Sequence, residues 1–364
     1  MRGSEYDAGH RAVREGVVLH RSSAARVMVR GEQAYERVEA LCPRDLFVRT
    51  GQILHGLVLD PAGGVLADLY VIPRDDDFLL LADGIDDAAL IAALGPDPDP
   101  EGRAVESLGS SHALLSLAGP YAWELLGALL GPEVSTIGYM TSIPVPELGE
   151  GGLCLRTGTT GEFGYDLLLR HADAEACIEQ LTRLGERFDL VEVPQPVLDR
   201  CALENGFFCP RHRGVIGRTP IELQLQWRVR YDHERLGPIL IAGRDRPLAR
   251  RLSWVIGRLE DPAPELGPLT REGELVGELI EGFHSPVLGC FVGLAMIDLR
   301  LAHAWIDGIF VGGAGEAGES SGLELRVEAP PLVQNRSLFV DPKKHVYAHR
   351  GEDRFPPIVP GEDT

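Results

Sequence analysis

The sequence predicts an α+β fold with antiparallel sheets and a separate all-β module toward its C-terminal end. Three strand-like apolar runs at 53–59, 65–72 and 78–81 are separated by Pro/Gly-rich and Asp-rich turns, a pattern that is typical of an antiparallel meander. From residue 252 onward, only short apolar runs occur between Gly, Pro and Asp residues, at 253–256, 275–280, 292–297 and 323–327. This spacing indicates a separate all-β module.

Helical patterns alternate with strands in the first half of the chain. After a polar, helix-like start, a strand at 27–29 leads into residues 31–41, whose apolar side chains recur at helical spacing. Residues 86–94 also look helical, and prolines break regular structure in the loop that follows at 95–102. The strand-then-helix pattern then returns, with strands at 113–117 and within 153–169, and helices at 121–130 and 172–185.

Length and composition exclude several classes of protein. A chain of 364 residues is expected to hold two or three domains. The formal net charge is −20, and such a surface repels polyanions, so we expect neither nucleic acid nor a membrane as the main partner. The six cysteines include no CxxC pair and no Cys/His cluster at zinc spacing, so we expect reduced thiols and no metal site. The N-terminal residues lack the apolar stretch of a signal peptide, which favours a cytoplasmic location.

A glycine-rich segment at 156–166 is the most informative candidate for ligand binding. Its three glycines within seven positions allow positive φ angles and a close approach of the backbone to a ligand. The segment presents Glu162, whose two oxygens can accept from adjacent N–H donors, as on an amino-pyrimidinone ring. The alternative is a plain hairpin turn with a solvated Glu162.

A second candidate is Asp68, which lies within the apolar run 65–72. An ionised carboxylate in such a strand costs free energy unless it is paired or hydrogen-bonded. Asp68 could therefore transfer a proton or stabilise a developing cation. Alternatively, it caps a turn or faces water.

The order of these segments resembles a known family. The Gly-rich strand with Asp68 is followed by R-T-G-T-T-G-E-F-G-Y-D at 156–166, by L-E-N-G at 203–206, and by T-P-I-E-L-Q-L-Q-W at 219–227. L-A-G-P at 117–120, G-E-L-I-E-G-F-H-S-P-V-L-G at 277–289 and F-V-D-P at 339–342 also match. Together they resemble the T-protein family, the aminomethyltransferase of the glycine cleavage system, which is related to tetrahydrofolate-dependent demethylases. The resemblance covers nearly the whole chain.

The resemblance implies a fold and its boundaries. It implies a three-domain cloverleaf with antiparallel sheets around a central folate channel. The first α+β domain would take 1–50 plus 145–245, and the second, ferredoxin-like, would take 51–144. A C-terminal all-β, barrel-like domain would take 246–350, and residues 351–364 would form a loose tail.

The resemblance also implies roles for residues. Glu162 would grip the pterin edge of tetrahydrofolate, and Asp68 would lie beside the folate nitrogens that receive the one-carbon unit, stabilising cationic, iminium-like species. Further folate-binding residues would be Gly161, Tyr165, Arg156, Glu204 and Trp227. The carbon donor, a small molecule or a lipoyl carrier protein, would enter from the opposite side of the channel.

The sequence departs from the family pattern at several positions. Tyrosines of the family are replaced by His55 and Thr159, an aspartate by Ala67, an arginine by Ala202 and a small residue by Gln224. Arg200 does not compensate for Ala202 on a helix, where it would point about 200° away. His55 is either a proton shuttle or substrate contact near Asp68, or a packed substitute for tyrosine. Residues 209–213, C-P-R-H-R, are expected to form a solvated loop.

Three functions are consistent with this pattern. The first is transfer of a methylene or methyl unit from an amine-type donor to tetrahydrofolate, with aminomethyl transfer as the leading case. The second is a tetrahydrofolate-dependent N-, O- or S-demethylase that acts on a small molecule. The third is a folate-binding scaffold without turnover, although the K-G-C-Y-x-G-Q-E motif of such relatives is absent from the sequence.

Overall fold

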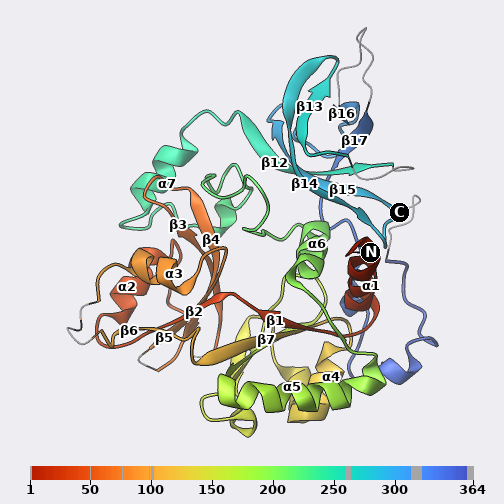
Figure 1. The fold of residues 1–364 in the computed structure, drawn as a ribbon. Helices are drawn as coiled ribbons and strands as arrows, with labels where there is room; N and C mark the ends of the chain where they lie inside the picture. Colours follow the sequence, from red (N-terminus) through yellow and green to blue (C-terminus); the bar gives the residue numbers. More distant parts are fainter. Residues whose placement is uncertain are drawn as a thin grey trace.

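The computed structural model describes residues 2–49, 51–75, 77–97, 99, 102–258, 264–312 and 322–358. Two mixed sheet-and-helix lobes lie side by side, and a β-barrel stands on them (Figure 1). Helices α1 (Arg2–Glu15) and α6 (Gln195–Asn205) lie between the barrel and the first lobe. No helix in the described part of the chain is both long and apolar enough to span a membrane.

The first lobe is a six-stranded sheet with helices on one face. Its strand order is β11 (Val191–Glu192), β1 (Val18–Ser22), β7 (His112–Ala118), β10 (Gly164–Arg170), β9 (Leu153–Arg156) and β8 (Thr141–Pro144). Because side chains alternate along a strand, Leu115 and Leu167 point toward helices α4 (Ala122–Leu130) and α5 (His171–Gly185). Leu114 and Leu168 point to the other face, where the second lobe packs.

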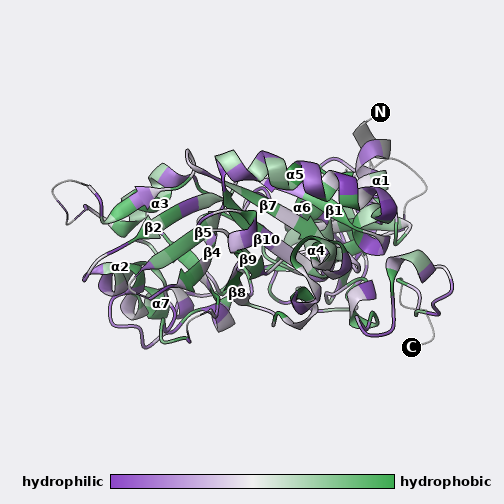
Figure 2. Ribbon diagram, turned by 90° about the horizontal axis from the view of Figure 1, so that it is seen from below, coloured by the Kyte–Doolittle hydropathy of each residue, from purple (hydrophilic) through white to green (hydrophobic). Residues whose placement is uncertain are grey.

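The second lobe is a five-stranded antiparallel sheet. Its strand order is β3 (Leu54–Leu59), β4 (Val65–Pro73), β5 (Phe78–Asp83), β2 (Ala25–Val29) and β6 (Val105–Ser107). Helices α2 (Ala34–Leu41) and α3 (Asp87–Leu94) cover one face, and the other face packs against the first sheet. Strands β4 and β5 are mostly apolar in Figure 2, as burial on both faces requires.

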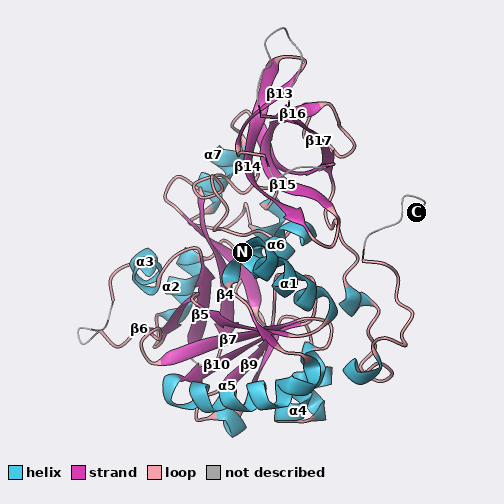
Figure 3. Cartoon of the chain, turned by 45° about the vertical axis from the view of Figure 1, so that its right-hand side comes forward, coloured by secondary structure: helices cyan, strands magenta, loops and turns pink. Residues whose placement is uncertain are grey.

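The third lobe is a closed barrel. It contains β12 (Arg250–Gly257), β15 (Cys290–Asp298), β14 (Glu274–Ser285), β13 (Gly267–Arg271), β16 (Ile309–Val311) and β17 (Leu323–Glu328), in that order around the barrel. Figure 3 shows it at the end of the molecule opposite α4 and α5. Helix α7 (Gly237–Arg244) precedes it. The short 3-10 helices are η1 (Pro132–Thr136), η2 (Pro146–Leu148), η3 (Glu186–Phe188), η4 (Gln226–Arg228), η5 (Arg336–Leu338) and η6 (Tyr347–His349).

The predicted α+β class and all-β C-terminal module are confirmed, and the sheets are antiparallel except where β1 pairs with β11. The sheets divide the chain differently from the expected boundaries. Strand β2 and helix α2, expected in the first domain, belong to the five-stranded sheet, because β2 pairs with β5 and β6. Strands β7 and β8, expected in the second domain, belong to the six-stranded sheet. The chain crosses between sheets at the short link from β1 to β2, which hydrophobic periodicity does not reveal. In the expected loose tail, Ile358 is buried and its carbonyl accepts a hydrogen bond from the Gln334 N–H at 2.7 Å.

Candidate active site

Two cavities meet at Asp68 and Thr159, which line both. The larger, of about 530 Å³, lies between strands β3 and β4, the segment 205–228 and the barrel. The smaller, of about 110 Å³, lies between β4, β7 and β10. The larger volume is in the range of pockets that hold organic ligands of cofactor size.

Asp68 is fixed at this junction by two basic side chains. The antiparallel pairing of β3 and β4 places Leu57 opposite Asp68, so His55 approaches it diagonally. His55 Nε2 lies 2.8 and 2.9 Å from the two carboxylate oxygens, and the Arg228 guanidinium forms an ion pair with the same group. Burial alone would raise the pKa of Asp68, but the charges of His55 and Arg228 outweigh it and hold the pKa well below its usual range. Asp68 is therefore ionised.

Arg228 is a site residue that the sequence analysis missed. It is buried, follows Trp227 on η4, and donates a second hydrogen bond to the Gly56 carbonyl at 2.6 Å. Its position after the T-P-x-E-x-x-L-x-W motif was visible in the sequence. Its partner was not, because it lies 160 positions away.

Glu162 lines neither cavity. Its carboxylate accepts hydrogen bonds from the backbone N–H of Arg336 at 3.1 Å and of Ser337 at 2.8 Å, and from the Ser337 hydroxyl at 2.6 Å. The Arg14 guanidinium lies 3.6 Å away. These contacts bind Glu162 to the segment that carries η5, so the geometry does not support its expected role as the pterin clamp.

Asp166, the last residue of the same glycine-rich motif, lines the smaller cavity instead. Its carboxylate accepts hydrogen bonds from the hydroxyls of Ser116, at 2.5 Å, and Thr157, and no Arg or Lys of the described chain forms an ion pair with it. Burial raises the pKa of Asp166. The sequence did contain a sign of this position. Side chains alternate along β10, and Tyr165 faces the helices, so Asp166 faces the opposite side of the sheet.

The other residues predicted from the glycine-rich motif have mainly structural contacts. The Arg156 guanidinium lies 4.6 and 4.5 Å from the ring centroids of Phe163 and Tyr165. Tyr165 is buried in the core of the first lobe and also lines the smaller cavity. Gly161 has φ +81°, and a Cβ there would lie 2.4 Å from an atom of Asn205. Of these three residues, only Tyr165 lines a cavity.

Trp227, which the family pattern led us to expect in folate binding, lies in the larger cavity. Its side chain lines that cavity and is 68% exposed, so its indole is available to a ligand. The Arg228 guanidinium lies 5.9 Å from the Trp227 ring.

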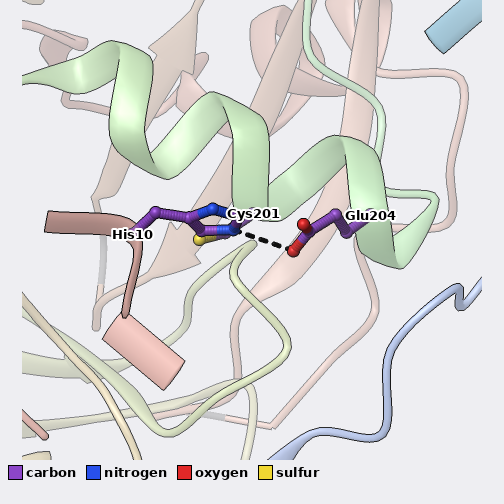
Figure 4. A group of neighbouring side chains, drawn as sticks. All are labelled: His10, Cys201 and Glu204. Carbon is purple, nitrogen blue, oxygen red and sulfur yellow. Dashed lines mark hydrogen bonds and ion pairs between the residues drawn. The ribbon is translucent and has the colours of Figure 1, made fainter. Parts of the chain in front are cut away.

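Glu204 belongs to a buried ionic network and to neither cavity (Figure 4). Its carboxylate contacts His10 Nε2 at 2.9 Å, Arg14 Nη2 at 2.6 Å and the Ser285 hydroxyl at 2.6 Å. This geometry joins α1, α6 and the barrel, and does not support the expected role in cofactor binding. His10, Cys201 and Glu204 could together ligate a metal ion, but the Arg14 guanidinium at the same carboxylate oxygen opposes a further cation there.

Residues 209–213 form a loop with Arg211 and Arg213 exposed, but the expected solvation does not hold for the rest of the segment. Cys209 and His212 are buried and line the larger cavity, and Arg211 pairs with Asp83 and Asp199. Neither ring nitrogen of His212 is hydrogen-bonded to a described residue. Burial lowers the pKa of His212 to about 4, so its ring is neutral at physiological pH.

Comparison with known proteins agrees with this architecture. Residues 4–233 match the GCVT N-terminal domain. The chain is 30% identical over 347 residues to an aminomethyltransferase of Frankia alni, covering 92% of this chain and 88% of that protein. It is 28% identical over 340 residues to an aminomethyltransferase of Mycobacterium leprae, covering 89% and 88%.

A solved structure shares the fold. The glycine cleavage system aminomethyltransferase T of Bartonella henselae superimposes with a TM-score of 0.76 at 22% identity, over 91% of this chain and 90% of that one. The matched domain covers more than half of the chain, and the full-length relatives extend the match into the barrel. The chain therefore belongs to the glycine cleavage T-protein (GCVT) family.

Proposed function

We propose that this protein transfers a one-carbon unit from an aminomethyl donor to tetrahydrofolate at the junction of the two cavities. The observation that carries the proposal is the position of Asp68, a buried and ionised carboxylate that lines both cavities. Membership of the GCVT family and the similarity to aminomethyltransferases support the reaction class.

Tetrahydrofolate fits the donors and acceptors of the site. Asp166 is a half-buried carboxylate whose partners are two hydroxyls, so it suits the adjacent N–H groups of an amino-pyrimidinone edge. We therefore transfer to Asp166 the clamp role first expected of Glu162. The larger cavity has room for the remainder of a folate-sized molecule. When bound, tetrahydrofolate supplies the nitrogens that accept the one-carbon unit.

The role of Asp68 is to stabilise positive charge that develops on the donor. As ammonia leaves a protonated aminomethyl donor, the C–N bonding pair goes with the nitrogen and positive charge develops on the methylene carbon, where a fixed carboxylate stabilises it. Arg228 offsets part of that negative charge, while it keeps Asp68 ionised and in place.

The role of His55 is to transfer a proton. An ionised carboxylate only accepts hydrogen bonds, so the proton of His55 lies on Nε2, which faces Asp68. In a neutral ring, Nδ1 then carries the lone pair, and no described residue forms a hydrogen bond with it. Because His55 lines the larger cavity, it can exchange a proton with the departing amine. The donor, a small amine or a carrier-bound lipoyl arm, reaches this pair through the larger cavity.

Tetrahydrofolate titration of the wild type, Asp166→Asn and Glu162→Gln tests the binding assignment. We expect at least tenfold weaker binding in D166N and near wild-type binding in E162Q, with circular dichroism to verify folding. Formation of methylenetetrahydrofolate from an aminomethylated dihydrolipoyl donor tests the reaction, with Asp68→Asn as the variant. Equal affinity in D166N or undiminished turnover in D68N would contradict the proposal.

A further inference from the structure

The larger cavity is lined by one cationic side chain that has no carboxylate partner in the described chain. Asp68 is its one carboxylate among the described lining residues, and it is paired with Arg228. Burial raises the pKa of the Cys209 thiol to about 12 and lowers that of His212 to about 4, so both are neutral at pH 7. His55 and Arg228 both contact Asp68, so the cation without a carboxylate partner is Arg44, which also lines the cavity.

The guanidinium of Arg44 makes no hydrogen bond or ion pair with any described residue. The acid next to it in sequence, Asp45, pairs instead with Arg230 at 3.4 Å. The backbone just before Arg44 is held in place, because the Pro43 carbonyl accepts a hydrogen bond from the Arg230 N–H at 2.8 Å. In a chain with a net charge of −20, an arginine without an acidic partner in a ligand-sized cavity is a ready site for an anion.

The walls near this charge are suited to an organic anion. Trp227 and Tyr139 line the same cavity and are exposed on their aromatic rings, so they can pack against a flat or aliphatic ligand body. Trp254 is held by a hydrogen bond from Nε1 to the Leu203 carbonyl at 2.9 Å, which leaves its indole as a fixed wall.

We propose that Arg44 binds a carboxylate of the ligand that occupies the larger cavity. A guanidinium holds a carboxylate through two parallel hydrogen bonds, which fixes its orientation as well as its position. The identity of that ligand rests on the proposed function: tetrahydrofolate carries carboxylates on its glutamate, and an amino-acid-type donor carries one as well. In both ligands, the group that Arg44 recognises is a carboxylate.

The test compares carboxylates with their neutral amides in the full-length protein. Tetrahydrofolate is compared with its glutamate diamide, and N-methylglycine with N-methylglycinamide in the presence of saturating tetrahydropterin. We expect the wild type to bind one of these carboxylates about tenfold more tightly than its amide, and Arg44→Gln to lose that preference. Arg49→Gln is the matched control, because Arg49 is exposed on the same loop and lines neither cavity.

Each outcome has one interpretation. A preference for tetrahydrofolate over its diamide assigns the carboxylate to the folate tail, and a preference for N-methylglycine assigns it to the donor. Absence of both preferences, or their persistence in R44Q, overturns the proposal. Failure of the proposed function is separate, since tetrahydropterin has no carboxylate: if it does not bind, the pterin site at Asp166 is wrong, and the comparison of N-methylglycine with its amide is then made without the pterin.

Discussion

Arg228 and Asp68, 160 positions apart in sequence, form a buried ion pair where the two cavities meet. The pair joins the segment after Trp227 to strand β4, and His55 completes it from β3. Removing one member of a buried pair leaves the other without compensation, which is more costly than replacing both.

A double-mutant cycle tests this coupling. We expect Arg228→Met to destabilise the protein by about 3 kcal/mol, because Asp68 stays buried without its guanidinium. The double variant R228M/D68N should be destabilised less than the sum of the two single destabilisations, by about 1 kcal/mol or more. Urea denaturation of the four proteins measures this difference, and simple additivity of the two effects would contradict the coupling.

The lowered pKa of Asp68 predicts a pH dependence of stability. A carboxyl group whose folded pKa lies below its unfolded value, near 3.9, contributes stability above the unfolded value and loses it as the pH falls toward the folded one. The wild type should therefore lose stability on acidification below about pH 4 more steeply than D68N. The free energy of unfolding from pH 6 to pH 3 measures this, and parallel curves for the two proteins would contradict the shift.

The sequence predicted the fold class because period-two and helical patterns depend on local residues. Helix α5 begins within one residue of the predicted 172–185, and the meander of β3, β4 and β5 occurs as predicted. The membership of β2 in the five-stranded sheet and of β7 in the six-stranded sheet was not predicted, because tertiary packing decides which β-strands pair.

The site was predicted in part, for the same physical reason. Asp68 was singled out from its strand context and His55 from its place in the family pattern, and the two are in hydrogen-bond contact. The glycine-rich motif contains two acids, Glu162 and Asp166, and its spacing alone does not tell which one faces a ligand. The choice depends on the distant Ser337, whose hydroxyl and N–H engage Glu162.

The buried network around Glu204 predicts an alkaline loss of stability. Burial alone would lower the pKa of His10, but its interactions with Cys201 and Glu204 outweigh it and raise the pKa from 6.5 to about 9. Stability from a raised pKa is fully present below the unfolded value and is lost as the pH rises through the folded one. As the pH rises from about 6.5 to 9, the free energy of unfolding of the wild type should fall by up to roughly 3 kcal/mol relative to that of His10→Gln. Urea denaturation across this range measures the difference, and an equal pH dependence in both proteins would show that His10 is neutral.

Replacing Gly161 by alanine should carry a steric cost that the same replacement at Gly217 does not. Gly161 has φ +81°, and an added Cβ would lie 2.4 Å from Asn205 and 2.5 Å from Asn335. Gly217 has the same φ with open space around it, so Gly217→Ala reports the cost of the backbone conformation alone, about 1 kcal/mol. Gly161→Ala should cost at least about 2 kcal/mol more, because it also displaces the Asn205–Asn335 hydrogen bond of 2.6 Å. Thermal and urea unfolding of both variants compare them directly. Equal destabilisation would mean that these two amides move aside freely, and that Gly161 is required only for its backbone angle.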